Sequence, residues 1–205
     1  MKVSEGDVMN NLEVLESLIK KNNGLMLTKE FLEAGISKKT LNEYLQKGYL
    51  ERVAHGIYLS RDALQDEMYV LQLRSSKAVF SHDTALFYHD LSDRDPLEWV
   101  ITLPSGYNAT RFKADGVKVY FVNSELLELG LVEFRTVHNS PVRMYNRERT
   151  ICDMIRNRST MDINILNEGV KRYIGSKEKN IALLMKYAKL LKVDNIVRQY
   201  LEVLM

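Results

Sequence analysis

The chain is poor in three kinds of structural marker. It holds a single cysteine, three prolines and no long apolar run in 205 residues. One cysteine excludes an internal disulfide and a zinc site made of several cysteines. A membrane-spanning helix needs about 20 consecutive apolar residues, and no such stretch occurs. The first residues, one lysine followed by acidic positions, match neither a secretory signal nor a transit peptide. We therefore expect a cytoplasmic protein.

The overall composition is that of an ordinary globular protein, with 45% hydrophobic and 27% charged residues. Its length is sufficient for two domains, which we expect at residues 1–60 and 61–205. The net charge of +2 hides a segregation. Residues 62–134 carry six basic and twelve acidic side chains, whereas residues 135–200 carry fourteen basic and six acidic ones. This contrast indicates either two surfaces with different partners or simply solvated charged faces.

The first domain shows a succession of short elements with clear boundaries. Apolar spacing and turn residues predict helices over 8–21, 29–34 and 38–47, then strands over 49–53 and 57–59. Thr28 and Ser37 are the expected N-caps of the second and third helices, and Gly35 and Gly48 their expected ends. Helices followed directly by a hairpin are typical of a winged helix-turn-helix, which binds DNA. A purely structural docking or dimerisation module is the alternative.

The second domain is expected to combine a sheet with helices. A helix is predicted within 62–76, and Ser81 is expected to cap another. Strand candidates lie at 97–104, 117–122, 131–137 and 142–146. From residue 147 to the end the pattern is helical. The sequence therefore predicts an α+β fold, with a mixed sheet over about 97–145 and a helical bundle over 147–205.

The third helix carries the expected DNA contacts. Leu41, Tyr44 and Leu45 form one face and are expected to pack inward. Side chains on the other face can enter a major groove, where amides read adenine and lysines bind phosphates. The hairpin tip adds contacts to the backbone or the minor groove. The candidate DNA-binding residues are Ser37, Lys38, Lys39, Thr40, Asn42, Glu43, Gln46, Lys47, Arg52 and His55. For each position an ordinary exposed residue is the alternative.

Signs of catalysis are sparse. His82 and His89 are seven residues apart, about 10.5 Å along a helix, which is too far for both to bind one zinc ion. We expect them to serve in helix capping and packing. The sequence holds no glycine-rich phosphate loop, nucleophile elbow or kinase signature. We therefore expect no catalytic site, metal or cofactor, with an enzyme of scattered catalytic residues as the alternative.

Three segments together resemble a known family. They are SKKTLNEYLQKGYLERVAHGIYL, FSHDTALFYHDLSDRDPLEWVITLPSGYN and RERTICDMIRN. Their order resembles the AbiEi-type antitoxins of bacterial abortive-infection, or type IV toxin-antitoxin, systems. The resemblance implies a repressor that binds inverted repeats in its own promoter. It also implies neutralisation of a cognate nucleotidyltransferase-like toxin, for which no stable complex is required.

By position, the resemblance assigns the repressor role to Lys38, Lys39, Thr40 and the wing around Arg52. It assigns the antitoxin role to the second domain, which contains Arg147, Glu148, Arg149, Thr150 and Asp153.

The basic residues of the second domain are candidates for a shared DNA or toxin surface. They are Arg143, Arg147, Arg149, Arg156, Arg158, Lys171 and Arg172. The spacing of Arg149 and Asp153 equally fits a structural i,i+4 ion pair at the start of a helix. Two other functions remain open: a winged-helix regulator without a toxin partner, and a protein-docking adaptor.

Overall fold

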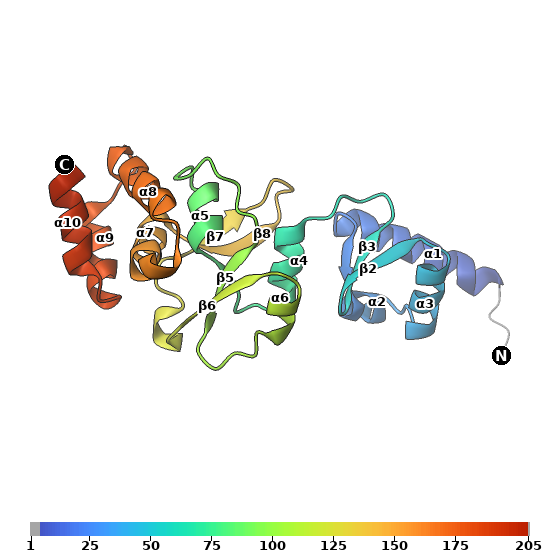
Figure 1. The fold of residues 1–205 in the computed structure, drawn as a ribbon. Helices are drawn as coiled ribbons and strands as arrows, with labels where there is room; N and C mark the ends of the chain where they lie inside the picture. Colours follow the sequence, from blue (N-terminus) through green and yellow to red (C-terminus); the bar gives the residue numbers. More distant parts are fainter. Residues whose placement is uncertain (1–4, 205) are drawn as a thin grey trace. The chain divides into compact units, whose positions relative to one another are not determined.

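A computed structural model describes residues 5–204, with side chains from residue 11 onward (Figure 1). The chain forms two compact units, Met1–Ser75 and Ser76–Met205. Residues 1–4 and 205, which the expected domains include, lie outside the described residues. Within 5–204, the strands form a three-stranded and a five-stranded sheet. The expected α+β class is confirmed.

The first unit contains the predicted helices and hairpin. Its elements are α1 (Glu5–Lys21), β1 (Leu25–Leu27), α2 (Thr28–Glu33), α3 (Lys38–Gln46), β2 (Leu50–Ala54), β3 (Ile57–Ser60) and α4 (Glu67–Arg74). The antiparallel sheet has the order β1-β3-β2. Helices α1, α2 and α3 share a core around Met26, Phe31 and Leu41. Strand β1 is not predictable from the sequence, because three residues are too short to show a strand pattern.

Helix α4 explains where the first unit ends. Its Val70 packs with Leu25, Ile57 and Leu59 in a second apolar cluster, so the helix covers the small sheet. The unit therefore extends to Ser75, past the boundary expected after residue 60. The helix predicted within 62–76 was assigned to the second domain, but its apolar side packs on the sheet of the first unit.

The boundaries of α2 and α3 follow from local hydrogen bonds. The Ser37 side chain accepts from the Thr40 N–H at 3.1 Å, so the predicted cap of α3 is confirmed. The predicted cap at Thr28 is wrong, because α2 begins one residue earlier than expected, with Leu27 at the N-cap. Glu30 accepts from the Leu27 N–H at 2.6 Å and satisfies this terminus. The Thr28 hydroxyl instead donates to the carbonyl of Gly56 in the hairpin, at 3.3 Å.

The second unit is a mixed sheet followed by helices. Its strands are β4 (Val79–Phe80), β5 (Val100–Pro104), β6 (Lys118–Val122), β7 (Leu131–Arg135) and β8 (Pro141–Tyr145). They lie in the order β6-β5-β4-β8-β7. The β5–β6 and β4–β8 pairs are parallel, whereas β4–β5 and β7–β8 are antiparallel. The predicted mixed sheet is therefore confirmed.

Helices surround this sheet and continue beyond it (Figure 1). They are α5 (His82–Tyr88), α6 (Thr110–Ala114), α7 (Arg147–Arg156), α8 (Ile163–Gly175), α9 (Ile181–Leu190) and α10 (Asp194–Leu204), with 3-10 turns at Ser124–Leu126 and Arg158–Thr160. Helix α7 is buried among α5, α8 and α9, and its Cys152 lies in the apolar core that these helices share. Every helix within the described part of the chain is too short or too polar to cross a bilayer.

The start of α5 corrects a second cap prediction. Ser81 stands at the N-cap position, but its side chain does not cap the helix. Its hydroxyl accepts from Thr102 Oγ1 at 2.9 Å and lies 2.9 Å from His82 Nδ1. Strand β4, directly before it, occupies the middle of the sheet. The predicted sheet, which begins near residue 97, leaves β4 out. The two residues of β4 are too few to show the alternation of apolar and polar side chains that marks a strand.

Candidate nucleic-acid interface

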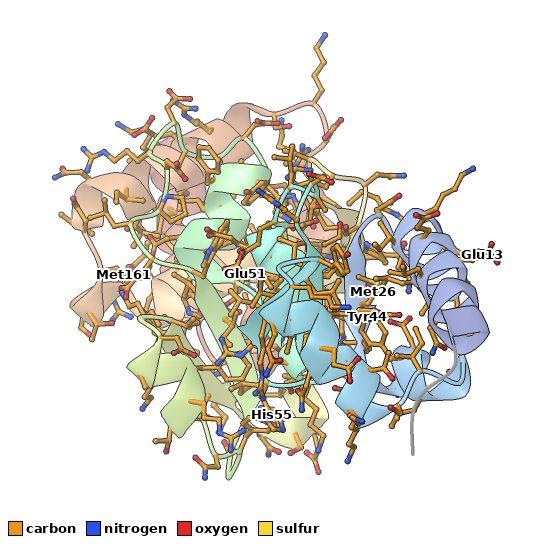
Figure 2. The ribbon with its side chains drawn as sticks, turned by 90° about the vertical axis from the view of Figure 1, so that its right-hand side faces the viewer. Glu13, Met26, Tyr44, Glu51, His55 and Met161 are labelled. Carbon is orange, nitrogen blue, oxygen red and sulfur yellow. The ribbon has the colours of Figure 1, made fainter. Side chains whose placement is uncertain are left out.

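Helix α3 has one buried and one exposed face. Leu41 and Tyr44 are 3% and 4% exposed and pack in the core of the first unit with Met26, whereas His55 of the hairpin is exposed (Figure 2). Leu45 is half-buried on the same inner side. The opposite side presents exposed polar residues, namely Lys38, Lys39, Asn42, Gln46 and Lys47. The predicted outward face of this helix therefore agrees with the structure.

The N-terminus of α3 is organised by its cap. Ser37 and Thr40 are also joined through their hydroxyl groups, whose oxygens are 2.9 Å apart. Lys38 and Lys39 lie exposed on this first turn, where the helix dipole adds partial positive charge. An anion such as a phosphate is favoured there. Thr40 is half-buried and engaged in the cap, so its hydroxyl is less available to a base than the sequence suggested.

The inner side of α3 ends in a buried phenol. The hydroxyl of Tyr44 is buried and has no hydrogen-bond partner among the described residues. Burial, reinforced by the nearby Glu43 carboxylate, raises the pKa of Tyr44, so its phenol stays neutral. The Tyr49 ring packs edge-on against it, with the ring centroids 6.0 Å apart. Glu43 itself is half-buried, at the border between the two faces of the helix.

The hairpin places two of the predicted residues side by side. Arg52 Nη2 donates to His55 Nδ1 at 2.8 Å, and both side chains are exposed. A guanidinium has no acceptor, so Nδ1 accepts and the His55 proton lies on Nε2. A β-bulge between Arg52 and Ala54 turns the strand at this point. The tip of the hairpin thus exposes the guanidinium of Arg52 hydrogen-bonded to the imidazole of His55.

Arg149 does not belong to any surface. It is fully buried, and its Nε donates to Asp153 Oδ2 at 2.9 Å. Its Nη1 donates to the carbonyls of Leu126 and Leu129 at 2.7 and 2.8 Å, and the guanidinium lies over the Tyr145 ring. The prediction that placed Arg149 on a DNA or toxin surface is therefore wrong. Arg149 instead forms the structural i,i+4 ion pair with Asp153 that the spacing offered as the alternative, and its Nη1 bonds tether the loop before β7.

The other residues at the start of α7 are also structural in their contacts. Glu148 is buried and accepts from the Tyr173 hydroxyl at 3.0 Å and from the Asn180 N–H at 3.3 Å. The Thr150 hydroxyl donates to the Asn146 carbonyl at 2.8 Å. These contacts join α7 to the helices that follow it. The segment that the resemblance associates with antitoxin activity is thus an internal support of the second unit.

The remaining basic candidates differ in their surroundings. Acidic side chains pair with Arg143, Arg147 and Arg172. Exposed positions are held by Arg156, Arg158 and Lys171. Ion pairing reduces what the first three offer to an external partner. A shared DNA or toxin surface on these six residues remains a prediction.

Both histidines of α5 make internal contacts. His82 is buried, stacks on Tyr120 with centroids 3.7 Å apart, and its Nε2 accepts from Asn157 Nδ2 at 3.0 Å. His89 Nε2 donates to the Tyr145 carbonyl at 2.7 Å. Across the described residues, no group of three or more histidine, cysteine or acidic side chains is arranged to hold a metal ion. Packing accounts for both side chains.

Two comparisons with known proteins gave a match, one over part of the first unit and the other over nearly the whole chain. Residues 13–61 match the family model described as a transcriptional regulator, AbiEi antitoxin. A similar solved structure is the crystal structure of the RV2827C protein from Mycobacterium tuberculosis, with a TM-score of 0.58 and 13% sequence identity. The match covers 96% of this chain and 80% of that one, and it shows a shared fold. No curated protein matches. The resemblance is thereby confirmed over residues 13–61, where the chain is similar to the AbiEi antitoxin family of transcriptional regulators.

Proposed function

We propose that this protein is an autoregulating antitoxin. Its first unit acts as a winged helix-turn-helix that binds duplex promoter DNA with inverted repeats and represses its own operon. Its second unit neutralises a cognate nucleotidyltransferase-like toxin, and the protein is not itself an enzyme. The observation that carries the repressor half is the Ser37-capped helix α3, whose lysine-bearing face is exposed directly before a β-hairpin. The match of residues 13–61 supports both halves.

The proposed DNA contacts follow from the chemistry of the exposed face. Helix α3 enters the major groove, as the second helix of such motifs does. Lys38 and Lys39 bind phosphates beside the helix N-terminus. Asn42 and Gln46 carry amides, which pair with the N6 and N7 edge of adenine. The joined Arg52 and His55 of the hairpin contact the backbone next to the groove.

The charge of this interface is modest. Residues 37–61 carry five basic and two acidic side chains. Each phosphate contact contributes through counterion release, so a small number of contacts gives limited affinity. Inverted repeats offer two half-sites, and two copies of the protein bound side by side double the number of contacts. We therefore propose that operator binding involves more than one copy.

Replacing Lys39 and Asn42 with alanine is expected to weaken operator binding. A true base contact contributes about 1 to 3 kcal/mol, so the double variant should bind at least about fivefold more weakly. Both side chains are exposed, so the variant should melt at the temperature of the parent. Fluorescence anisotropy with a labelled duplex of the protein's own promoter, at fixed salt concentration, measures the change.

A single charge-matched variant serves as the control. Lys20 is exposed at the end of α1, away from α3 in sequence, and Lys20→Ala removes the same charge. It should leave the affinity nearly unchanged. Equal binding by the parent and by the Lys39→Ala, Asn42→Ala double variant would refute the assignment of α3 as the recognition helix.

The same double variant separates the two proposed activities in cells. Because the toxin-directed role is assigned to the second unit, the variant should still rescue cells that express the adjacent toxin gene. Repression of a reporter fused to the promoter should be lost. A folded variant that loses both activities would contradict this division. If no gene for a nucleotidyltransferase-like protein adjoins this one, a regulator without a toxin or a docking adaptor becomes the better description.

A further inference from the structure

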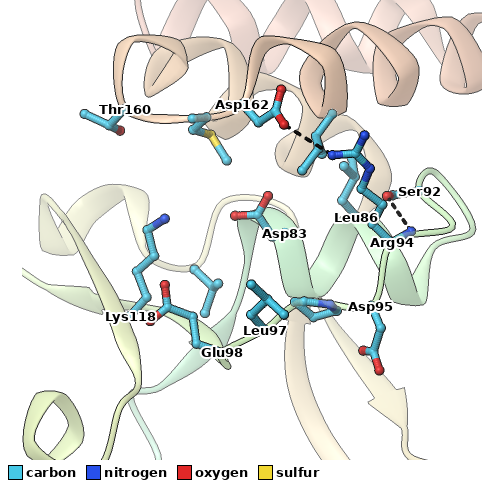
Figure 3. Close-up of a pocket in the computed structure, with 14 residues that line it drawn as sticks. Asp83, Leu86, Ser92, Arg94, Asp95, Leu97, Glu98, Lys118, Thr160 and Asp162 are labelled. Carbon is cyan, nitrogen blue, oxygen red and sulfur yellow. Dashed lines mark hydrogen bonds and ion pairs between the residues drawn. The ribbon is translucent and has the colours of Figure 1, made fainter.

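The second unit contains a cleft that the proposed function does not use. Its volume is about 560 Å³, and it is lined by residues from α5, the 92–98 loop, β5, β6 and the 160–165 segment (Figure 3). These segments are distant in sequence, so no local motif predicts the cleft. The volume falls in the range of about 300 to 1,000 Å³ that is typical of pockets for small molecules.

Much of the wall of the cleft is apolar. Leu86 and Val100 are buried, and Met161 and Ile165 are half-buried. Leu97 lines the same space, although its side chain is fully exposed. A single exposed leucine is common on protein surfaces, but Leu97 extends the apolar wall of the cleft. A ligand with methylene groups would remove this surface from water, which is favourable.

The charged groups of the cleft are unbalanced. The carboxylates of Asp83, Glu98 and Asp162 point into the space together with Arg94 and Lys118 (Figure 3). Arg94 Nη1 binds Asp162 Oδ2 at 3.2 Å, so these two charges compensate each other. Lys118 then stands alone beside two carboxylates. With Asp95 at the rim, four acidic and two basic side chains line the cleft, so two negative charges are left without a matching cation.

Asp83 is the most enclosed of these carboxylates. It lies half-buried on the first turn of α5, and burial raises its pKa against the opposing effect of Lys118. The nearby carboxylates of Glu98 and Asp162 raise the pKa of Asp83 further, so both repel its charged form. A cation bound among them would relieve both the burial and the mutual repulsion.

Two other ligand classes fit this arrangement poorly. A metal ion needs closely spaced donors, and no group of three acidic or histidine side chains is suitably arranged in residues 5–204. A nucleotide or another phosphate compound would bring several negative charges against the carboxylates of the cleft. An organic cation with an aliphatic body satisfies both the charge and the apolar wall.

We propose that this cleft binds a small aliphatic polyamine. One ammonium group lies between Asp83 and Glu98 and donates hydrogen bonds to both carboxylates. The methylene chain packs on Leu86 and Val100. A second ammonium group extends past Leu97 toward Asp95, which lines the rim of the cleft.

Isothermal titration calorimetry of the full-length protein with spermidine and putrescine tests this site. We expect saturable binding of spermidine. Glu98→Gln and Asp83→Asn should each weaken it about tenfold or more, because each removes a charged hydrogen-bond partner of the ammonium group. Glu98 is exposed, so that variant should fold normally, and a thermal melt checks the Asp83 variant. Glu125→Gln, an exposed change in the same unit, is the matched control and should bind like the parent.

Several results would overturn the proposal. These are the absence of saturable spermidine binding, equally tight binding of AMP or Mg²⁺ to the parent, or unchanged affinity in both cleft variants. The Lys39→Ala, Asn42→Ala variant should bind spermidine as the parent does. The polyamine site and the DNA-binding role can therefore fail independently.

Discussion

Arg149→Ala is expected to destabilise the second unit by about 3 to 5 kcal/mol, the cost of breaking a buried ion pair by removing one partner. The substitution leaves the Asp153 carboxylate, 4% exposed, without its cation. It also removes the donor to the carbonyls of Leu126 and Leu129. Because whole domains are stable by only about 5 to 15 kcal/mol, this loss is large enough to leave the unit partly unfolded.

The loop around the arginine shows how closely it is enclosed. A Cβ added at Gly130 would lie 2.5 Å from the Cβ of Arg149, so the backbone passes directly over the side chain. Arg149→Lys should recover little of the stability, because one ammonium group cannot reproduce the separate Nε and Nη1 hydrogen bonds. The expected order of stability is therefore parent, then Arg149→Lys, then Arg149→Ala.

Urea unfolding followed by tryptophan fluorescence measures this effect in the correct unit. Trp99 is the single tryptophan of the sequence, and it packs against Phe80 and Tyr88 in the second unit. Arg156→Ala is the control, since this arginine is exposed on the same helix, and it should change stability by less than about 0.5 kcal/mol. An Arg149→Ala protein as stable as the Arg156→Ala protein would show that the buried network is dispensable.

Elements with local signals were predictable from the sequence. Helix α3 has an N-cap residue, an apolar face and a glycine at its end, all within twelve residues. The Tyr49 N–H donates to the Tyr44 carbonyl across Gly48, whose φ of +72° favours glycine. The outward face of the helix followed from the same pattern. The AbiEi resemblance rested on three such local segments, and the match at residues 13–61 covers the first of them, residues 37–59.

Features that depend on distant contacts were not predictable. Thr28 resembled a helix cap, yet its hydroxyl partner is the carbonyl of Gly56, 28 residues away. Strands β1 and β4 are too short for alternation, and only the sheet around them makes them strands. Arg149 and Asp153 have the same i,i+4 spacing whether a pair is exposed or buried. The 126–130 loop covers the pair, and this burial makes it an internal support and not part of a binding surface.

Acid is expected to weaken the second unit through His82. Its Nε2 accepts from Asn157 Nδ2, while the same amide nitrogen donates to the Asp153 carbonyl at 3.0 Å. The amide therefore cannot rotate to accept a proton from the ring without losing that bond. Burial, assisted by Arg149 and Lys118, lowers the pKa of His82 to about 3. The folded protein thus resists protonation that the unfolded chain accepts near pH 6.5.

The direction of the pH effect follows from this difference. Stability from a neutral His82 is fully present above pH 6.5 and is lost as the pH falls from 6.5 toward 3, because the unfolded state binds the proton first. Between pH 7 and pH 4 the loss should reach about 3 kcal/mol. Carboxylate titrations also occur in this interval. They are largely common to the parent and a histidine variant, so comparing the two isolates the histidine.

His82→Asn is the suitable variant, because His82 has a φ of +49° and asparagine tolerates the left-handed region better than other residues. Urea unfolding of the second unit, followed by Trp99 fluorescence, should show the parent losing about 3 kcal/mol more than His82→Asn between pH 7 and pH 4. His138→Asn, an exposed histidine in the same unit, should behave like the parent. If parent and His82→Asn lose stability in parallel, His82 accepts a proton inside the folded unit, and the hydrogen bond from Asn157 does not hold it neutral.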